Sequence, residues 1–315
     1  MRLITWAREP ESPRWTWRIG LLVEGGATVI DLQAAGEACG FGPAGGPPPD
    51  PLEWFDLDGP WCAFARDLDR RVACDAGELD RLGARVVRAL AAVHLRAPVP
   101  RPGKVVAVGL NYRDHAAEAR MPVPGTPVIF AKFSTALIGS GQPIVLPGVP
   151  RRIDYEGELA VVIGPRVRAI PAREALGAVL GFTNANDVSD RDSQKADGQW
   201  VRAKSCDTFA PLGPAIVTLD ELPNPAALRI ELRLNGTAMQ SSSTEQFVFD
   251  VPALVAFISE TITLEPGDVI LTGTPAGVGF ARRPPVFLQP GDVVEVEIEG
   301  LGTLRNPVAA APGSS

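Results

Sequence analysis

Two glutamates that open an apolar segment are the residues in this sequence best placed to hold a cation. Segment 154–163 is rich in β-branched and apolar residues and is stopped by a Gly-Pro pair, which predicts a β-strand. Side chains alternate along a strand, so Glu156 and Glu158 share one face, which continues as apolar residues. Two carboxylates entering a covered strand require protonation, basic partners or a cation. An edge strand with two solvated glutamates is the other interpretation, but the apolar continuation favours the cation.

A third carboxylate, Asp187, follows the strand-like segment 180–186 and opens a polar run. A carboxylate at the end of a strand is a suitable third ligand for the ion proposed at Glu156 and Glu158. Three carboxylates around one ion indicate a hard metal, Mg²⁺ or Mn²⁺, with coordination positions left for water or substrate. Zinc is disfavoured because no set of Cys and His surrounds these acids.

His115 is the only histidine beyond residue 98, and it follows a predicted strand at 104–109. If the segment after that strand is a helix capped by Asp114, then His115 and Glu118 face the same way. A carboxylate beside an imidazole fixes its tautomer, as a general acid/base requires. The alternative is a pair of polar surface side chains, which is the commoner role of this spacing.

Two further polar side chains are candidates for substrate contact. Lys204 could hold a substrate carboxylate or a developing enolate, although a solvated loop position is the default for any single lysine. The glycine-rich turn 273–279 lacks the lysine and the following helix of a phosphate-binding loop. A turn that lines a substrate pocket is still possible there, with Thr274 offering a hydroxyl.

These residues fall on a chain that is predicted to be mainly β with some α. Strands are expected at 18–32 (a hairpin), 104–109, 127–133, 143–146, 158–163, 178–185, 214–217, 229–234, 269–272 and 293–298. Helices are expected at 76–95, 171–180 and 251–262, the last capped by Asp250, and a Gly/Pro-rich loop at 40–51. The extended segment 97–103 is the predicted linker between a small α+β N-terminal accessory domain, residues 1–98, and a catalytic domain, residues 103–311.

The composition narrows the class of protein. The 315 residues are 45% hydrophobic and 21% charged, as in ordinary globular proteins. The net charge of −7 and the lack of a basic cluster argue against a nucleic acid or an anionic membrane as partner. The sequence has neither an apolar run of the ~20 residues that a membrane helix needs nor a signal-peptide core at its start, so we expect a cytoplasmic protein. The four cysteines form no C-x-x-C pair and are expected to be free thiols.

Six motifs, in order along the chain, resemble those of the fumarylacetoacetate hydrolase family. They are Gly109-Leu110-Asn111-Tyr112 with His115 and Glu118; Asp154-Tyr155-Glu156-Gly157-Glu158-Leu159; Asn186-Asp187-Val188-Ser189 with Arg191-Asp192; Gln194 with Asp197-Gly198-Gln199-Trp200; Lys204-Ser205-Cys206-Asp207-Thr208; and Leu271-Thr272-Gly273-Thr274-Pro275-Ala276-Gly277-Val278-Gly279. They span about residues 103–309, which is nearly all of the predicted catalytic domain.

The resemblance implies a mixed β-sheet roll that forms a homodimer and holds one Mg²⁺ or Mn²⁺ per subunit. It assigns the ion to Glu156, Glu158 and Asp187, and implies that a 2-oxo acid substrate chelates the ion. The N-terminal residues look like the extra domain of the longer members of the family.

The resemblance also implies roles for residues around the ion. His115 and Glu118, on a short lid helix, would activate water or move protons, and Lys204 would contact the substrate's oxygens. Substrate binding is assigned to Tyr112, Arg191, Gln194 and Thr274. Cys206 departs from the family, which usually has an aromatic or other large residue at that position.

Three hypotheses about function follow. The first is a Mg²⁺- or Mn²⁺-dependent hydrolase that cleaves a C–C bond in a β-diketo acid, such as an acylpyruvate or fumarylpyruvate. The second is an oxaloacetate-type decarboxylase or a hydroxymuconate-type isomerase that works through the same enolate, so the residues that hold the ion cannot separate it from the first. The third is a non-catalytic binding protein built on the same scaffold.

Overall fold

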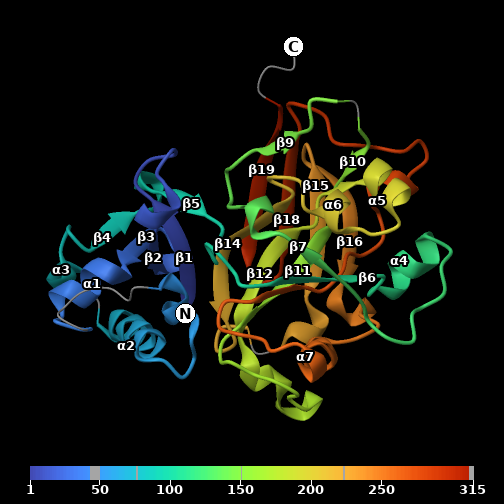
Figure 1. The fold of residues 1–315 in the computed structure, drawn as a ribbon. Helices are drawn as coiled ribbons and strands as arrows, with labels where there is room; N and C mark the ends of the chain where they lie inside the picture. Colours follow the sequence, from blue (N-terminus) through green and yellow to red (C-terminus); the bar gives the residue numbers. More distant parts are fainter. Residues whose placement is uncertain (43–49, 76, 150, 223, 312–315) are drawn as a thin grey trace.

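The computed structural model describes residues 1–42, 50–75, 77–149, 151–222 and 224–311, so residues 43–49 of the predicted Gly/Pro-rich loop lie outside them. Two large sheets, a two-stranded sheet and several helices make a mainly β architecture with some α, as predicted (Figure 1). The N-terminal part forms a smaller lobe beside a larger one that carries the predicted catalytic residues (Figure 1).

The larger of the two sheets crosses from one lobe to the other. Its main path runs β4-β3-β2-β1-β14-β12-β11-β17-β6-β7. The strands along this path are β4 (Val87–Ala89), β3 (Thr28–Asp31), β2 (Arg18–Val23), β1 (Arg2–Ala7), β14 (Ala210–Thr218), β12 (Val179–Asn186), β11 (Gly157–Ile163), β17 (Val269–Leu271), β6 (Val105–Gly109) and β7 (Val128–Lys132). Off this path, β5 (His94–Arg96) pairs with β1 and β8 (Leu137–Ile138) pairs with β14.

The N-terminal lobe is joined to the rest of the chain by strand pairing. Strand β1 pairs antiparallel with β14, with Leu3 opposite Ile216. One hydrophobic cluster also includes Trp54 and Leu68 from the N-terminal lobe together with Val162 from β11. Residues 1–98 therefore share both a sheet and a core with the larger lobe.

The second sheet packs beside the strands that carry the acids. It runs β16 (Thr237–Ser243), β15 (Arg229–Leu234), β18 (Val293–Ile298), β19 (Gly302–Ala310) and β9 (Ile144–Leu146). A separate two-stranded sheet joins β10 (Ile153–Asp154) to β13 (Ser189–Asp190). Leu232 on β15 contacts the position of Gly157, where an added Cβ would lie 3.3 Å from it, so glycine allows the two sheets to approach closely.

The α-helices have between four and fifteen residues. They are α1 (Leu32–Ala38), α2 (Pro60–Cys74), α3 (Glu78–Leu82), α4 (Arg113–Glu118), α5 (Arg191–Asp197), α6 (Val201–Lys204) and α7 (Val251–Thr261). The 3₁₀ helices include Pro51–Phe55, Ala172–Ala178 and Gly279–Ala281. Within the described residues no helix is long and apolar enough to cross a membrane.

Two helix predictions had different outcomes. Asp250 caps α7 as expected, because its carboxylate accepts the N–H of Ala253 at 2.9 Å. The helix predicted at 76–95 is wrong. The short helix α3 forms at the start of this segment and ends at Leu82, just before Gly83, whose φ is 71°. Strands β4 and β5 follow it. Pairing of β4 with β3 and of β5 with β1 outweighs the helical spacing of their apolar residues.

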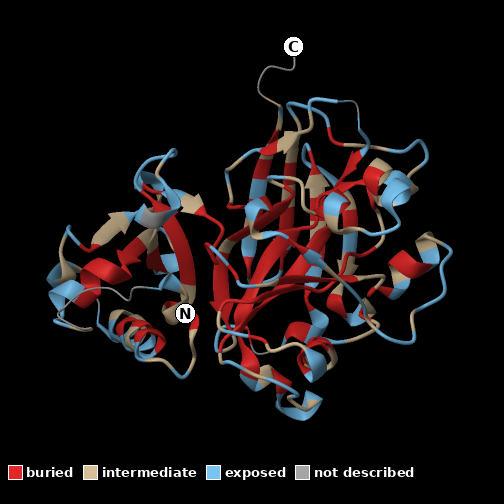
Figure 2. Cartoon of the chain, in the orientation of Figure 1, coloured by how far each residue is buried: buried red, intermediate tan, exposed pale blue. Residues whose placement is uncertain are grey.

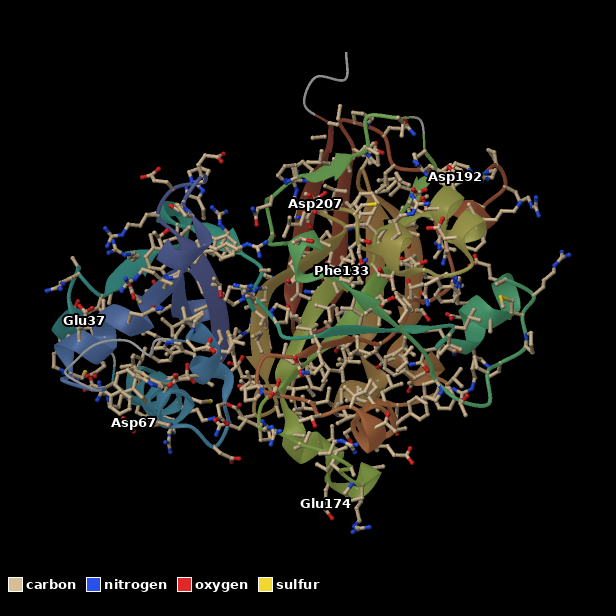
Figure 3. The ribbon with its side chains drawn as sticks, in the orientation of Figure 1. Glu37, Asp67, Phe133, Glu174, Asp192 and Asp207 are labelled. Atoms are coloured by element: carbon tan, nitrogen blue, oxygen red, sulfur yellow. The ribbon has the colours of Figure 1, made fainter. Side chains whose placement is uncertain are left out.

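Burial distinguishes the strands that carry the acids from the periphery of the molecule. Every residue of β11 is buried, and the strand pairs with β12 on one side and β17 on the other. The alternative of an edge strand with solvated glutamates is therefore wrong. Buried residues fill the sheets (Figure 2), whereas labelled acids such as Glu37, Asp67 and Glu174 lie at the exposed periphery (Figure 3).

Candidate active site

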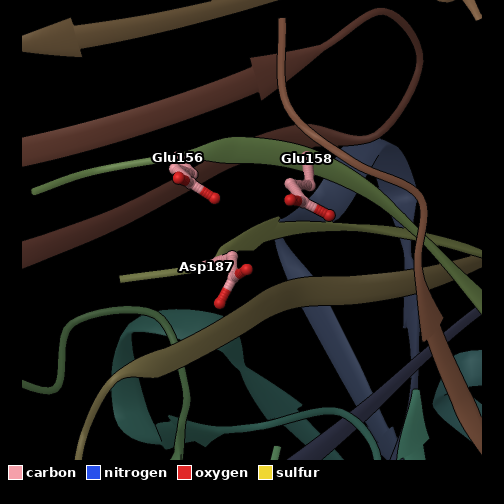
Figure 4. Close-up of side chains that lie close together, drawn as sticks. All are labelled: Glu156, Glu158 and Asp187. Carbon is pink, nitrogen blue, oxygen red and sulfur yellow. The ribbon is translucent and has the colours of Figure 1, made fainter. Parts of the chain in front are cut away.

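Three buried carboxylates meet at the start of β11 and the end of β12. Gly157 is paired with Asn186, so Glu156, just before β11, lies beside Asp187, just after β12. The N–H of Asp187 donates to the carbonyl of Glu156 at 2.8 Å. One carboxylate oxygen from each of Glu156, Glu158 and Asp187 lies within 4.8 Å of the others, and the side chains point toward one another (Figure 4).

Side-chain hydrogen bonds fix the backbone that presents these acids. The Asn186 side chain accepts the N–H of Glu156 at 2.9 Å, and Gln240 accepts the N–H of Gly157 at 2.8 Å. Gln240 is buried on β16 and donates its own N–H groups to Thr274 Oγ1 and to the carbonyl of Pro275. The acid-bearing strand, the second sheet and the turn after β17 are thus held in one network.

Three cations lie against two of the acids. Lys204 Nζ is 2.7 Å from Glu156 Oε2 and 2.6 Å from Asp187 Oδ2, and Lys132 Nζ is 2.5 Å from Asp187 Oδ1. The Arg191 guanidinium is 2.6 Å from Glu156 Oε1 and 2.8 Å from Asp154. Glu156 and Asp187 therefore each have a cation on both carboxylate oxygens.

The two glutamates have opposite electrostatic environments. Burial alone would raise the pKa of Glu156, but Lys204 and Arg191 outweigh it and lower that pKa to about 2. Burial raises the pKa of Glu158 well above its usual value, and the nearby charges of Asp187 and Glu156 add to this effect. Glu158 accepts the N–H of Gly273 at 2.7 Å but forms no ion pair within the described part of the chain.

These residues fit a divalent cation. Four acids (Asp154, Glu156, Glu158 and Asp187) share the site with three cations (Lys132, Arg191 and Lys204), and among the described residues Glu158 lacks a counter-charge at ion-pair distance. A divalent ion beside Glu158 would supply it, and an all-carboxylate donor set suits Mg²⁺ or Mn²⁺. Among the residues that the structure describes, this is the only group of three acids, histidines or cysteines close enough to hold a metal ion.

The predicted acid/base pair lies on α4, beside the turn that follows β17. His115 Nδ1 is 3.3 Å from Glu118 Oε2, and Glu118 Oε1 accepts the N–H of Gly277 at 3.0 Å. Asp114 was predicted to cap this helix, but that prediction is wrong because Tyr112 occupies the N-cap position. Its carboxylate instead accepts the Ser242 hydroxyl at 2.5 Å. These contacts dock α4 onto β16 and the 274–279 turn.

A cavity of about 140 Å³ joins most of the predicted site. Seven predicted residues line it: His115, Glu156, Asp187, Arg191, Gln194, Lys204 and Thr274. Glu118 and Glu158 lie behind this lining, each in contact with a turn backbone.

Tyr112, which was assigned to substrate binding, and Cys206, where the sequence departs from the family, both lie away from the cavity lining in the described part of the chain. Tyr112 is fully buried, its ring packs against Phe247 at 4.8 Å between centroids, and its hydroxyl has no hydrogen-bond partner among the described residues. It does not line the cavity in the described part of the chain. Cys206 contacts the carbonyl of Arg202 and packs beside the core cluster of the second sheet, so the structure gives it no contact with the cavity.

Sequence reasoning missed several residues of this site. Lys132 is fully buried on Asp187, and Asp154 holds Arg191 while accepting the backbone N–H of Gly279. Phe130 and Trp200 form part of the cavity lining. A lysine within the apolar strand predicted at 127–133 was the one available signal, because a buried lysine requires an acidic partner.

Comparison with known proteins agrees with this site. The family described as fumarylacetoacetate (FAA) hydrolase C-terminal matches residues 104–309, which is more than half of the chain. The chain belongs to the fumarylacetoacetate hydrolase family.

Similar proteins in the family are named for several different activities. The chain is 52% identical over 214 residues to oxaloacetate tautomerase FAHD2A, mitochondrial, of Bos taurus, covering 67% of this chain and 68% of that protein. The structure of 5-carboxymethyl-2-hydroxymuconate delta-isomerase from Mycobacterium smegmatis matches with a TM-score of 0.73 and 35% identity, over 98% of this chain and 100% of that one. Maleylpyruvate hydrolase from Sphingobium sp. SYK-6 matches with a TM-score of 0.74 and 31% identity, over 99% of this chain and 100% of the other. The cytoplasmic location stays a prediction.

Proposed function

We propose that this chain is a Mg²⁺- or Mn²⁺-dependent enzyme that interconverts the keto and enol forms of a small 2-oxo acid of the oxaloacetate type. The observation that carries this proposal is a histidine–carboxylate pair beside three buried acids at one small cavity. The 52% identity to a protein named oxaloacetate tautomerase favours tautomerisation over the other reactions of enolates.

His115 is the group suited to move the proton. A carboxylate only accepts hydrogen bonds, so the contact with Glu118 places the imidazole proton on Nδ1 and leaves Nε2 free to take or give a proton. His115 lines the cavity, whereas Glu118 is anchored behind it by the N–H of Gly277. His115 thus acts as general acid and base, and Glu118 orients it.

Lys204 is the group suited to hold negative charge on the substrate. Its ammonium lines the cavity, and although burial lowers its pKa, Asp187 and Glu156 raise it above the usual value overall, so the side chain stays charged. Arg191 and Gln194 are joined by a 2.9 Å hydrogen bond and line the same cavity. When bound at Glu156, Glu158 and Asp187, the divalent ion would supply polarisation of the 2-oxo group.

A panel of substrates tests this proposal. Purified protein with Mg²⁺ or Mn²⁺ is given enol-oxaloacetate, keto-oxaloacetate and 2,4-dioxopentanoate, and enol loss, CO₂ release and pyruvate release are followed separately. We expect accelerated enol loss from oxaloacetate with little CO₂ or pyruvate. Release of CO₂ as the main reaction would replace the proposal with decarboxylation.

Hydrolysis of a β-diketo acid is the second candidate, and the likeness to maleylpyruvate hydrolase favours it. In that reaction His115, oriented by Glu118, would deprotonate water for attack on the distal carbonyl. Pyruvate release from 2,4-dioxopentanoate in the same panel would support it. Metal binding without turnover of any substrate would favour a non-catalytic binding protein instead.

We also propose that the chain forms a homodimer through the edge strand β7 and the loop before it. Five of the seven large apolar side chains that are exposed in the described chain lie in this loop, on this strand or directly after it: Met121, Val123, Val128, Ile129 and Phe133. The segment 121–131 carries no charged residue, so two copies would meet there without repulsion between like charges. Light scattering of the wild type and of Ile129→Glu tests this, and a wild-type monomer would refute it.

A further inference from the structure

The cavity has a charged part and an apolar part, and the apolar part has no role in the proton transfer described above. The charged side chains that line it are Glu156, Asp187, Arg191 and Lys204. The apolar wall, as we call it, consists of Val108, Leu110, Phe130 and Trp200. It comes from the end of β6, from β7 and from the start of α6, whereas the acids come from β11 and β12.

Aromatic packing makes the apolar wall firm. The rings of Phe130 and Trp200 meet edge to face, with centroids 5.4 Å apart and planes at 75°. The indole of Trp200 also rests on the backbone of Gly109, because a Cβ added there would lie 2.7 Å from Trp200 Cζ3. Trp200 is therefore held between a ring and a main chain.

The wall lies at a fixed distance from the cation that would bind the substrate. Trp200 and Lys204 are one helical turn apart, and the N–H of Lys204 donates to the carbonyl of Trp200 at 3.0 Å. Side chains four residues apart lie on the same face of a turn, separated by about 6 Å of rise. The Lys204 ammonium also lies 5.3 Å from the centre of the Phe130 ring, so the wall begins directly beside the charged part.

The volume and the charges limit what can extend toward the wall. The cavity of about 140 Å³ is small beside the roughly 300–1,000 Å³ of a typical small-molecule pocket. The described lining residues of the wall carry no charge, so they offer no partner to a second carboxylate. A carboxylate at the far end of a long chain would lose its hydration against two aromatic rings.

We propose that Trp200, seated on Gly109 and against Phe130, is a stop that restricts the site to compact 2-oxo acids of roughly four or five carbons and excludes acids of about seven or more. The inference rests on the proposed function only in taking the 2-oxo-carboxylate to bind at the charged part. Binding of ligands, which needs no turnover, is therefore its test.

The experiment is calorimetric titration of the Mg²⁺-loaded protein with oxalate, 2,4-dioxopentanoate and 2,4-dioxooctanoate. We expect the eight-carbon acid to bind the wild type at least about tenfold more weakly than the five-carbon acid, since each surplus methylene in a tight pocket costs about tenfold or more. Trp200→Ala should recover at least about tenfold of that loss, and Trp200→Phe an intermediate amount. Oxalate, which is too short to reach the wall, should bind Trp200→Ala with a Kd within about threefold of the wild-type value.

Two further variants bracket the result. Gly109→Ala should push the indole into the cavity and weaken the five-carbon acid as well, which is the opposite of the effect of Trp200→Ala. Val149→Ala, at an exposed position outside both the cavity lining and the proposed dimer surface, should leave the length preference unchanged. Melting curves confirm that each variant is folded.

The outcomes separate this inference from the proposed function. Equal affinity of the wild type for the five- and eight-carbon acids, or an unchanged ratio in Trp200→Ala, would overturn the stop while leaving the proposed function intact. Failure of oxalate to bind the metal-loaded wild type would overturn both, because the charged part would then not hold a 2-oxo-carboxylate.

Discussion

Two clusters on this chain are built from the same kinds of charged side chain and differ in where they lie. On the outer face of the second sheet, Arg233 pairs with Glu231 at 2.5 Å and Glu297 at 2.6 Å and lies 3.6 Å from Glu295, with side chains between about a quarter and a half exposed. At the ends of β11 and β12, Lys132 and Lys204 contact Asp187 at similar distances, with side chains at most 3% exposed.

The difference in burial separates a structural cluster from a functional one. The surface pairs follow from strand register, since Arg233 is opposite Glu295 and Glu231 is opposite Glu297 across β15 and β18. Water screens such pairs, so they need no further partner. The buried cluster loses that screening and contains Glu158, which forms no ion pair in the described chain and whose pKa is raised by burial and by Asp187 and Glu156, although the charge of Lys204 acts to lower it. An excess of buried acid is costly unless something else neutralises it.

Removal of the unpaired acid should have the largest effect. We expect Glu158→Gln to lose Mg²⁺ or Mn²⁺ binding and to lower kcat/KM by at least ~10³-fold, because the ion supplies several kcal/mol of charge stabilisation. The metal-free variant should melt at or above the wild-type temperature, since burial raises the pKa of Glu158 and the neutral amide avoids a buried charge. Calorimetric metal titration and melting curves measure the two effects. Full metal affinity in Glu158→Gln would contradict the assignment.

The acid/base pair should come next. His115→Ala or Glu118→Ala should lower kcat by ~10²–10⁴-fold, the usual contribution of a general acid/base, while metal affinity stays near that of the wild type. His115→Ala removes the lining imidazole, whereas Glu118→Ala removes only the group that orients it. A full rate in His115→Ala would refute its role in proton transfer.

The sequence was informative wherever local geometry decides position. Alternation along one strand puts Glu156 and Glu158 on one face, and Asp187 follows a recognisable strand end, so the carboxylates could be placed together before the fold was known. The cap at Asp250 depends on its own turn alone and was also predicted correctly.

The sequence was uninformative wherever contacts between residues far apart in the chain determine the structure. The contact of Lys132 with Asp187 spans 55 positions, and that of β1 with β14 spans more than 200, so no local pattern reveals them. Residues 83–96 have helical spacing but form β4 and β5 because neighbouring strands pair with them. Packing of Trp200 on Gly109 likewise depends on tertiary contact.

The buried Lys132 allows the buried and surface clusters to be compared through stability rather than activity. Lys132→Met leaves the buried Asp187 with one counter-charge fewer, and loss of one partner from a buried ion pair costs about 3–5 kcal/mol. Denaturant unfolding of the metal-free protein measures this change. Lys195→Met, which removes an exposed lysine from α5, is the matched control and should shift stability by about 0.5 kcal/mol or less. Equal effects of the two substitutions would show that Lys132 is not held as a buried charge.

The smallest effect is expected in the surface cluster around Arg233. Arg233→Met breaks three contacts with acids, yet exposed pairs contribute only about 0.2–1 kcal/mol each at most. We therefore expect a loss of about 1 kcal/mol in dilute buffer, measured by denaturant unfolding. That loss should shrink in 1 M salt, where the screening length falls to about 3 Å. The loss caused by Lys132→Met should persist in the same salt, because solvent ions do not reach a fully buried pair. If salt reduced both losses equally, the buried cluster would be solvated, and the argument for a cation beside Glu158 would fail with it.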